Sequence, residues 1–235
     1  MRSGVEVRRV QQVGSSTLTV SVPREWAKEV GLKQGDVVSL RREDDGTLRV
    51  IPGMPKQKVE TVKCVVDADK CIQPGLLARI ITGLYIIGHD SIQIVSKKEL
   101  GPEHLEEIRR TTQRLTGINV VEQTFNQVLI QSFVDPTRFP VAGLLRRLYI
   151  ITSSMLNAGV RALKEGRISL AQEVLHMEDE VDRIYWLVVR QLLLAAQDKE
   201  VGKKIGIESP TSIAGYRVIA KCLEKIGDYS EGMAK

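Results

Sequence analysis

The sequence predicts a multidomain α+β chain, because three regions differ in the periodicity of their apolar residues. In residues 1–54, apolar and polar residues alternate with a period of two, which is typical of half-buried strands. In residues 55–137, strand-like and helix-like segments follow one another. Residues 138–235 carry helical periodicity and no strand signal. We therefore expect a small β domain, a small mixed α+β domain and an all-α three-helix bundle.

The composition is that of an ordinary globular protein and narrows the classes of function. The 235 residues include 43% hydrophobic and 27% charged residues, and the formal net charge is +5. This mild excess of basic residues permits nucleic-acid binding without requiring it. The three cysteines form no C-x-x-C pair and the three histidines are scattered, which disfavours a disulfide framework and a Cys/His zinc site. Met1–Ser3 leads directly into a strand pattern without a signal peptide, and no apolar stretch reaches the roughly 20 residues of a spanning helix. We expect a cytoplasmic protein.

The first region reads as strand, glycine turn, strand, short helix and hairpin. Residues 18–22 alternate apolar and polar side chains, as a strand does. Pro23 opens a short helix, because proline suits the first turn, and Gly31 ends it. The Asp45-Gly46 pair between two apolar runs predicts a hairpin turn.

This order of elements resembles the AbrB/SpoVT/MazE swapped-hairpin family over residues 5–52. The residues that carry the resemblance are Val7-Arg8-Arg9-Val10, Gly14-Ser15-Ser16, Leu18–Val22, Pro23-Arg24-Glu25-Trp26, and Gly31-Leu32 with Gly35-Asp36. The resemblance implies that two chains interleave their hairpins into one β-barrel. It also implies that basic residues on one face of this barrel contact DNA.

Basic and hydroxyl side chains of the first region are the candidate DNA contacts. Arginine and lysine pair with phosphates, and hydroxyl groups add further hydrogen bonds. The candidates are Arg2, Arg8, Arg9, Ser15, Ser16, Thr17, Arg24 and Lys28. The alternative is that the module only dimerises and its charges are solvated, because Glu25 and Glu29 lie among the basic residues of the short helix.

The second region predicts a small mixed sheet with two helices. Strands are expected over residues 59–66, 91–95, 120–122 and 127–133, and helices over residues 74–88 and 102–116. The region has no glycine-rich phosphate loop and no catalytic constellation. The sequence assigns it no role.

The third region predicts helices over about residues 141–165, 167–198 and 210–234. The middle helix has an apolar seam at a/d spacing, which is typical of a helical bundle. The seam residues are Ala171, Val174, Val181, Tyr185, Val188, Leu192 and Ala195. Glu178 interrupts the seam, and Asp182 follows one turn later on the same side.

The last helix repeats this acidic pattern with Glu224 and Asp228, which are again four residues apart. Two E-x-x-x-D pairs on adjacent helices predict a site of four carboxylates. Oxygen ligands suit hard cations such as Mg²⁺, Mn²⁺ or Ca²⁺, and iron and zinc also accept carboxylates. The alternative is a solvated acidic surface, because so short a motif is common by chance.

The third region resembles the phosphate-uptake regulator PhoU over roughly residues 140–235. The matching residues are Ala171-Gln172-Glu173-Val174, Asp179-Glu180-Val181-Asp182, Ile219-Ala220 and Leu223–Tyr229. The resemblance implies iron or zinc bound through E/D-x-x-x-D motifs, and action on a phosphate ABC transporter and its sensor kinase. Carried over, the metal ligands are Glu178, Asp182, Glu224 and Asp228, with Asp179 as a fifth.

The chain departs from that family in one respect, because the family usually has two three-helix halves in tandem and this sequence has one. Either the chain is a shortened form, or two chains each supply a half. A swapped-hairpin dimer at the front would bring two halves together. We therefore expect a homodimer or a higher even oligomer.

These patterns favour a phosphate-uptake regulator that binds DNA through its front module and a metal through its bundle. The alternative is a signalling adaptor for a phosphate ABC transporter or sensor kinase, with the front module serving only to dimerise. An enzyme with a dinuclear carboxylate site is disfavoured, because no histidine accompanies the acidic pairs. The sequence also has no nucleophile elbow and no Walker loop. We expect a protein that is not an enzyme.

Overall fold

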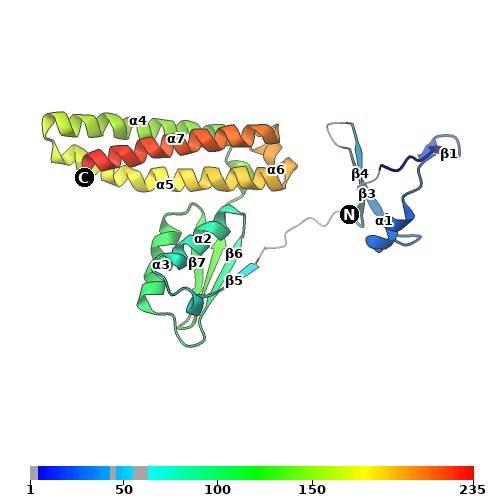
Figure 1. Ribbon diagram of the computed structural model, residues 1–235, viewed down its shortest axis with the longest axis horizontal. Helices are drawn as coiled ribbons and strands as arrows, with labels where there is room; N and C mark the ends of the chain where they lie inside the picture. The colour runs from blue at the N-terminus through cyan, green and yellow to red at the C-terminus, as the bar shows by residue number, and fades with distance from the viewer. Residues whose placement is uncertain (1–4, 43–45, 55–62) are drawn as a thin grey trace. The chain divides into compact units, whose positions relative to one another are not determined.

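The computed structural model describes residues 5–42, 46–54 and 63–235, and the chain divides into two compact units (Figure 1). The front unit is Met1–Val59 and the second unit is Glu60–Lys235. The expected α+β class is confirmed, with strands in the front unit and a mixed sheet followed by long helices in the second. Within the described residues, no helix combines the length and apolar character needed to cross a membrane. The domain limits expected at residues 54 and 137 stay predictions.

The front unit consists of two hairpins and a short helix. Its elements are β1 (Gln11–Val13), β2 (Thr17–Thr19), α1 (Arg24–Glu29), β3 (Val38–Arg42) and β4 (Leu48–Pro52). β1 pairs with β2 and β3 pairs with β4, both antiparallel, and the turn after β1 uses Gly14 at φ 69°. Each sheet stays two-stranded, so the described residues of one copy form no closed barrel. Arg2 and Asp45 lie outside the described residues.

None of the described residues of the front unit is buried. Leu18 is 70% exposed and Leu40 is 61% exposed. The expected strand over residues 18–22 is wrong at its end, because β2 stops at Thr19. A domain this small is stable only when it buries its apolar surface. The alternating pattern therefore marks apolar side chains that the described residues of their own unit leave largely uncovered.

The second unit begins with a mixed sheet and two helices, which we call the sheet domain (residues 63–135). Its elements are β5 (Lys63–Asp67), α2 (Leu76–Ile86), β6 (Ser91–Val95), α3 (Pro102–Gln113), β7 (Ile118–Gln123) and β8 (Gln127–Ser132). The strand order is β5-β6-β8-β7, with β5 parallel to β6 and the other pairs antiparallel. Of the strand expected over residues 59–66, residues 59–62 lie outside the described part.

One face of this sheet packs into a core with the two helices. Ile92 and Ile94 of β6 pair with Ile130 and Val128 of β8, and all four are buried. Val65, on the other face, is 62% exposed. The sheet domain is therefore a two-layer structure with one open sheet face.

The rest of the unit is a bundle of three long helices and one short helix (Figure 1). The helices are α4 (Val141–Glu165), α5 (Ile168–Gln197), α6 (Lys199–Lys204) and α7 (Pro210–Ala234). α4, α5 and α7 each contact the other two, so the expected three-helix bundle is confirmed. Gly166 ends α4 in a left-handed conformation, and the Ser209 hydroxyl accepts a hydrogen bond from the Thr211 N–H at the start of α7. The sequence analysis did not expect α6.

A buried arginine joins the sheet domain to α5. Arg190 is 3% exposed, and its Nη2 donates to Oδ1 of Asp90 at 3.0 Å. Its Nη1 donates to the carbonyl of Tyr85, and its guanidinium lies 4.8 Å from the centroid of that ring. A buried charge is costly unless it is paired and hydrogen-bonded. These partners therefore fix the sheet domain against the bundle.

Candidate functional site

The carboxylates expected to bind a metal lie on the neighbouring helices α5 and α7. Glu178 lies on the seam of α5 between the buried residues Val174 and Val181, and its side chain is 17% exposed. The side chain of Asp182, one turn later, is equally enclosed. On α7, Glu224 is buried. The seam expected from the sequence is confirmed, and carboxylates interrupt it.

The α5 carboxyl groups have raised pKa values. The pKa of Glu178 is raised to about 7, first by burial and then by the nearby carboxylates of Asp182 and Glu231, against the opposing effect of Arg114. Burial also raises the pKa of Asp182, and repulsion from Glu224 and Asp228 adds to this effect. These groups therefore act on one another electrostatically. We call them the carboxylate cluster (Glu178, Asp182, Glu224, Asp228 and Glu231).

Arg114, at the end of α3, brings a cation from the sheet domain to this cluster. Its Nη2 lies 2.6 Å from Oδ2 of Asp182 and 3.6 Å from Oε2 of Glu178. Its Nε lies 3.8 Å from Oδ1 of Asp179, which is on the exposed side of α5. One guanidinium thus spans three of the five expected ligands.

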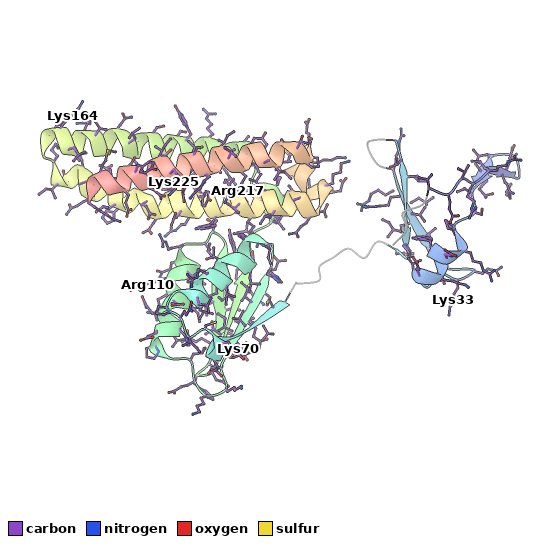
Figure 2. All side chains as sticks on the ribbon, viewed as in Figure 1. Lys33, Lys70, Arg110, Lys164, Arg217 and Lys225 are labelled. Atoms are coloured by element: carbon purple, nitrogen blue, oxygen red, sulfur yellow. The ribbon has the colours of Figure 1, made fainter. Side chains whose placement is uncertain are left out.

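Two lysines pair with the carboxylates of α7. Lys221 Nζ donates to both carboxylate oxygens of Glu224, at 2.5 and 2.6 Å. Lys225 Nζ donates to Oδ2 of Asp228 at 2.6 Å. Lys225 and Arg217 both project from α7 (Figure 2). All four E-x-x-x-D carboxylates therefore have a basic partner from the chain itself.

The carboxylate cluster has donor atoms that suit a metal, but in this structure basic side chains hold these donor atoms. Carboxylate oxygens are the ligands that hard cations prefer. Across residues 5–42, 46–54 and 63–235, however, no three histidine, cysteine, aspartate or glutamate side chains are placed to hold one ion. Arg114 holds the α5 carboxylates, and Lys221 and Lys225 hold those of α7. In this arrangement the chain's own cations neutralise the cluster, so a metal would have to displace them before it could bind these carboxylates.

The candidate DNA contacts within the described residues of the front unit are all exposed. Ser15 and Ser16 form the turn between β1 and β2, and Thr17 begins β2. Arg24 and Lys28 lie one turn apart on α1. Arg8 and Arg9 precede β1, and Arg8 forms an ion pair with Glu6.

The second hairpin adds basic residues that the sequence analysis did not single out. Arg41 of β3 lies directly opposite Arg49 of β4, and Arg42 follows on β3. All three side chains are exposed. Among the described residues of the front unit, eight are basic and four are acidic.

Arg114 is the main residue that the sequence analysis missed. It lies 68 positions before Asp182, and its partners follow from how α3 packs near α5. No periodicity or motif in the sequence connects the two positions. The only signal available was an arginine at the end of a predicted amphipathic helix, which is common on solvated surfaces.

Two family models match the chain. One is described as PhoU domain and matches residues 145–235, which covers most of α4 and all of α5, α6 and α7. The other is described as antidote-toxin recognition MazE, bacterial antitoxin, and matches residues 11–58. No curated protein matches the chain, and no solved structure matches it. The expected fusion of a MazE-like front module with a PhoU domain is confirmed.

Proposed function

We propose that this chain is a cytoplasmic, non-enzymatic regulator of phosphate uptake that binds DNA as a dimer of its front unit. The observation that carries the proposal is the combination, in one unit, of exposed apolar strands and an excess of basic side chains. The PhoU match supports the phosphate-related part of this role. The MazE match supports dimerisation and DNA binding, which are common among domains of that kind.

The exposed apolar residues support the dimer. Leu18, Val20 and Leu40 are each more than half exposed, and burial of such side chains contributes about 1.5–3 kcal/mol apiece. A second copy of the unit supplies matching strands, because the two hairpins of one copy are open on their edges. Interleaving the four hairpins of two copies would bury their apolar side chains in one shared core.

The dimer would also concentrate positive charge. Each copy brings eight basic and four acidic described residues to the shared barrel. Phosphate contacts of this kind release counterions, so binding should weaken steeply with salt. Arg41 and Arg49 lie opposite each other on the β3–β4 ladder, and arginine side chains suit phosphate oxygens.

The second candidate function is a signalling adaptor that acts on a phosphate ABC transporter or sensor kinase. The observation in its favour is that acidic residues accompany the basic ones: Glu25 lies on α1 beside Arg24, and Glu6 pairs with Arg8. In that case the front unit only holds two copies together. Dimerisation without DNA binding separates this function from the first.

Metal binding by Glu178, Asp179, Asp182, Glu224 and Asp228 is a further part of the proposal. The support is the all-oxygen donor set on two adjacent helices, and Arg114 and Lys221 would have to release their carboxylates first. Iron or zinc is expected from the resemblance, and Mn²⁺, Mg²⁺ and Ca²⁺ suit the same donors. Metal content of the purified full chain, with Asp182→Asn plus Glu224→Gln as the variant, tests this part.

Fluorescence anisotropy of the full chain with its own upstream DNA duplex, across a salt series, tests the main proposal. We expect tight binding at low salt that weakens steeply, and a loss of at least tenfold in Arg8→Ala plus Arg9→Ala. Lys164→Ala plus Arg167→Ala removes the same charge from the bundle and serves as the control. Absence of DNA binding by a dimeric chain would favour the adaptor.

A further inference from the structure

A pocket lies where the sheet domain meets the bundle. Its volume is about 530 Å³, and its walls come from α2, α3 and α5. Ala78, Ile86, Leu115 and Trp186 make much of its lining apolar. Pockets of roughly 300–1,000 Å³ with apolar walls and a few polar groups are typical of small-molecule sites. Both family models leave the sheet domain's part of this pocket unmatched.

A glycine in the last turn of α2 leaves space in the wall of the pocket. Gly83 lines the pocket, and a Cβ at this position would meet no atom within 4 Å. Its backbone is ordinary right-handed helix, so neither a turn nor a close contact requires glycine there. Glycine inside a helix costs about 1 kcal/mol relative to alanine. The space that the missing side chain leaves is therefore a feature that local structure does not explain.

The cationic groups of the pocket are three arginines. Arg79, Arg110 and Arg114 line it from α2 and the end of α3, and Arg110 is marked on α3 in Figure 2. Within the described residues, the Arg79 side chain has no ion-pair or hydrogen-bond partner. Glu107, also in the lining, accepts hydrogen bonds from the N–H groups of Gly75 and Ala78, at 2.5 and 3.2 Å.

We propose that this pocket binds a small organic anion with an apolar body, whose negative group lies against Arg79 and Arg114. The apolar walls bury the body, and the guanidinium groups pair with the carboxylate or similar anionic group. Neither DNA binding by the front unit nor metal binding by the bundle is needed for this proposal.

Binding at this site would compete with the carboxylate cluster for Arg114. Asp182 lines the same pocket and now holds the Arg114 guanidinium at 2.6 Å. An anion that takes over this guanidinium leaves Asp182 and Glu178 without their cation. The sheet domain is thereby given a role, because the occupancy of its pocket determines the charge balance of α5.

Calorimetry of the full chain with 2-naphthoate, an aromatic carboxylate, tests the proposal. We expect one saturable site per chain that moves the ¹⁵N-indole resonance of Trp186, which lines the pocket. Trp26→Phe assigns that resonance, because the chain has two tryptophans. Gly83→Leu should weaken binding at least tenfold by filling the pocket. Gly215→Leu, on an exposed part of α7 with no atom near the new Cβ, should leave it unchanged.

Two further comparisons test whether the negative charge of the ligand matters and whether the ligand competes with Asp182 for Arg114. Arg79→Met should weaken binding of 2-naphthoate about tenfold and leave binding of the neutral 2-naphthamide unchanged. Asp182→Asn should tighten 2-naphthoate binding at least threefold, because Arg114 is then released. The proposal is overturned if 2-naphthoate does not bind, if Gly83→Leu and Gly215→Leu bind alike, or if naphthamide responds to Arg79→Met as naphthoate does. Unchanged or weaker binding by Asp182→Asn would overturn the competition.

Discussion

The front unit and the second unit differ in how far their apolar side chains are buried. In the second unit, Leu77, Ile81, Leu148 and Val188 are completely buried. In the front unit, no described residue is buried, and Leu18 is 70% exposed. The hydrophobic effect applies to both units, so the second unit gains stability from its buried core, whereas the described residues of the front unit leave most of their apolar surface in water. This difference supports the proposal that the front unit associates with a second copy of itself.

The largest expected effect is on dimerisation, when charges replace exposed apolar residues of the front unit. Leu18→Asp plus Leu40→Asp places charges on the surface that a second copy would cover, so the dissociation constant of the dimer should rise more than a hundredfold. Sedimentation equilibrium measures this constant. Thr19→Asp, on the opposite face of β2 from Leu18, adds a charge away from that surface as the control and should dimerise normally. A variant that dimerises as tightly as the wild type would contradict the association role.

A medium effect is expected where the two parts of the second unit meet. Arg190→Ala removes the buried hydrogen bonds to Tyr85 and Asp90, so the free energy of unfolding should fall by about 3 kcal/mol. Urea unfolding of the full chain, followed by helical circular dichroism, measures this loss. Arg217→Ala, a half-exposed arginine of α7 that only lies over the Tyr185 ring, should lose about 1 kcal/mol or less. Equal losses of unfolding free energy in the two variants would argue against Arg190 as the residue that holds the sheet domain to the bundle.

The smallest effect concerns the pH dependence that Glu178 confers. Its pKa in the folded chain is about 7, above the ordinary 4.5, so the folded state binds the proton more tightly than the unfolded state. Stability should therefore fall as pH rises from about 4.5 to about 7 and stay level above that. Glu178→Gln removes this penalty and should raise the free energy of unfolding by about 1 kcal/mol at pH 8, with no gain at pH 4.

Urea unfolding at the two pH values, with a chelator present, checks this prediction. Glu173→Gln, on the exposed side of α5, is the control, and its effect should not depend on pH. A gain at pH 4 that equals the gain at pH 8 would show that the Glu178 proton is not involved.

The sequence predicted best those features that have local causes. α4 and α7 begin and end at the expected residues, because Gly166 and Ser209-Pro210 act within their own turns. The missed helix α6 also had a local signal, since the Asp198 carboxylate accepts hydrogen bonds from the N–H groups of Glu200 and Val201. Gly202 lies inside α6, where a Cβ would lie only 3.3 Å from the Ile207 carbonyl oxygen.

Features that depend on contacts between residues far apart in the sequence were predicted less well. The E-x-x-x-D carboxylates could be placed on the seam of a bundle, because their spacing is a property of one helix. Their partner Arg114 could not, because it reaches them only through the packing of α3 near α5. The front strands came out shorter than their alternation suggests, because strand length depends on a neighbouring strand that one copy does not supply.

The most direct test of the central claim compares DNA binding by the wild type and by Leu18→Asp plus Leu40→Asp in one salt series. That variant keeps every arginine and lysine of the front unit but adds two carboxylates per chain, and Thr19→Asp, which adds a carboxylate on the other face of β2, controls for the effect of added charge on DNA binding. The proposed function predicts that the wild type binds its upstream duplex with a steep salt dependence, and that the variant loses at least a hundredfold in affinity at low salt. If the variant binds as tightly and with the same salt slope, the dimeric front unit is not the DNA-binding element.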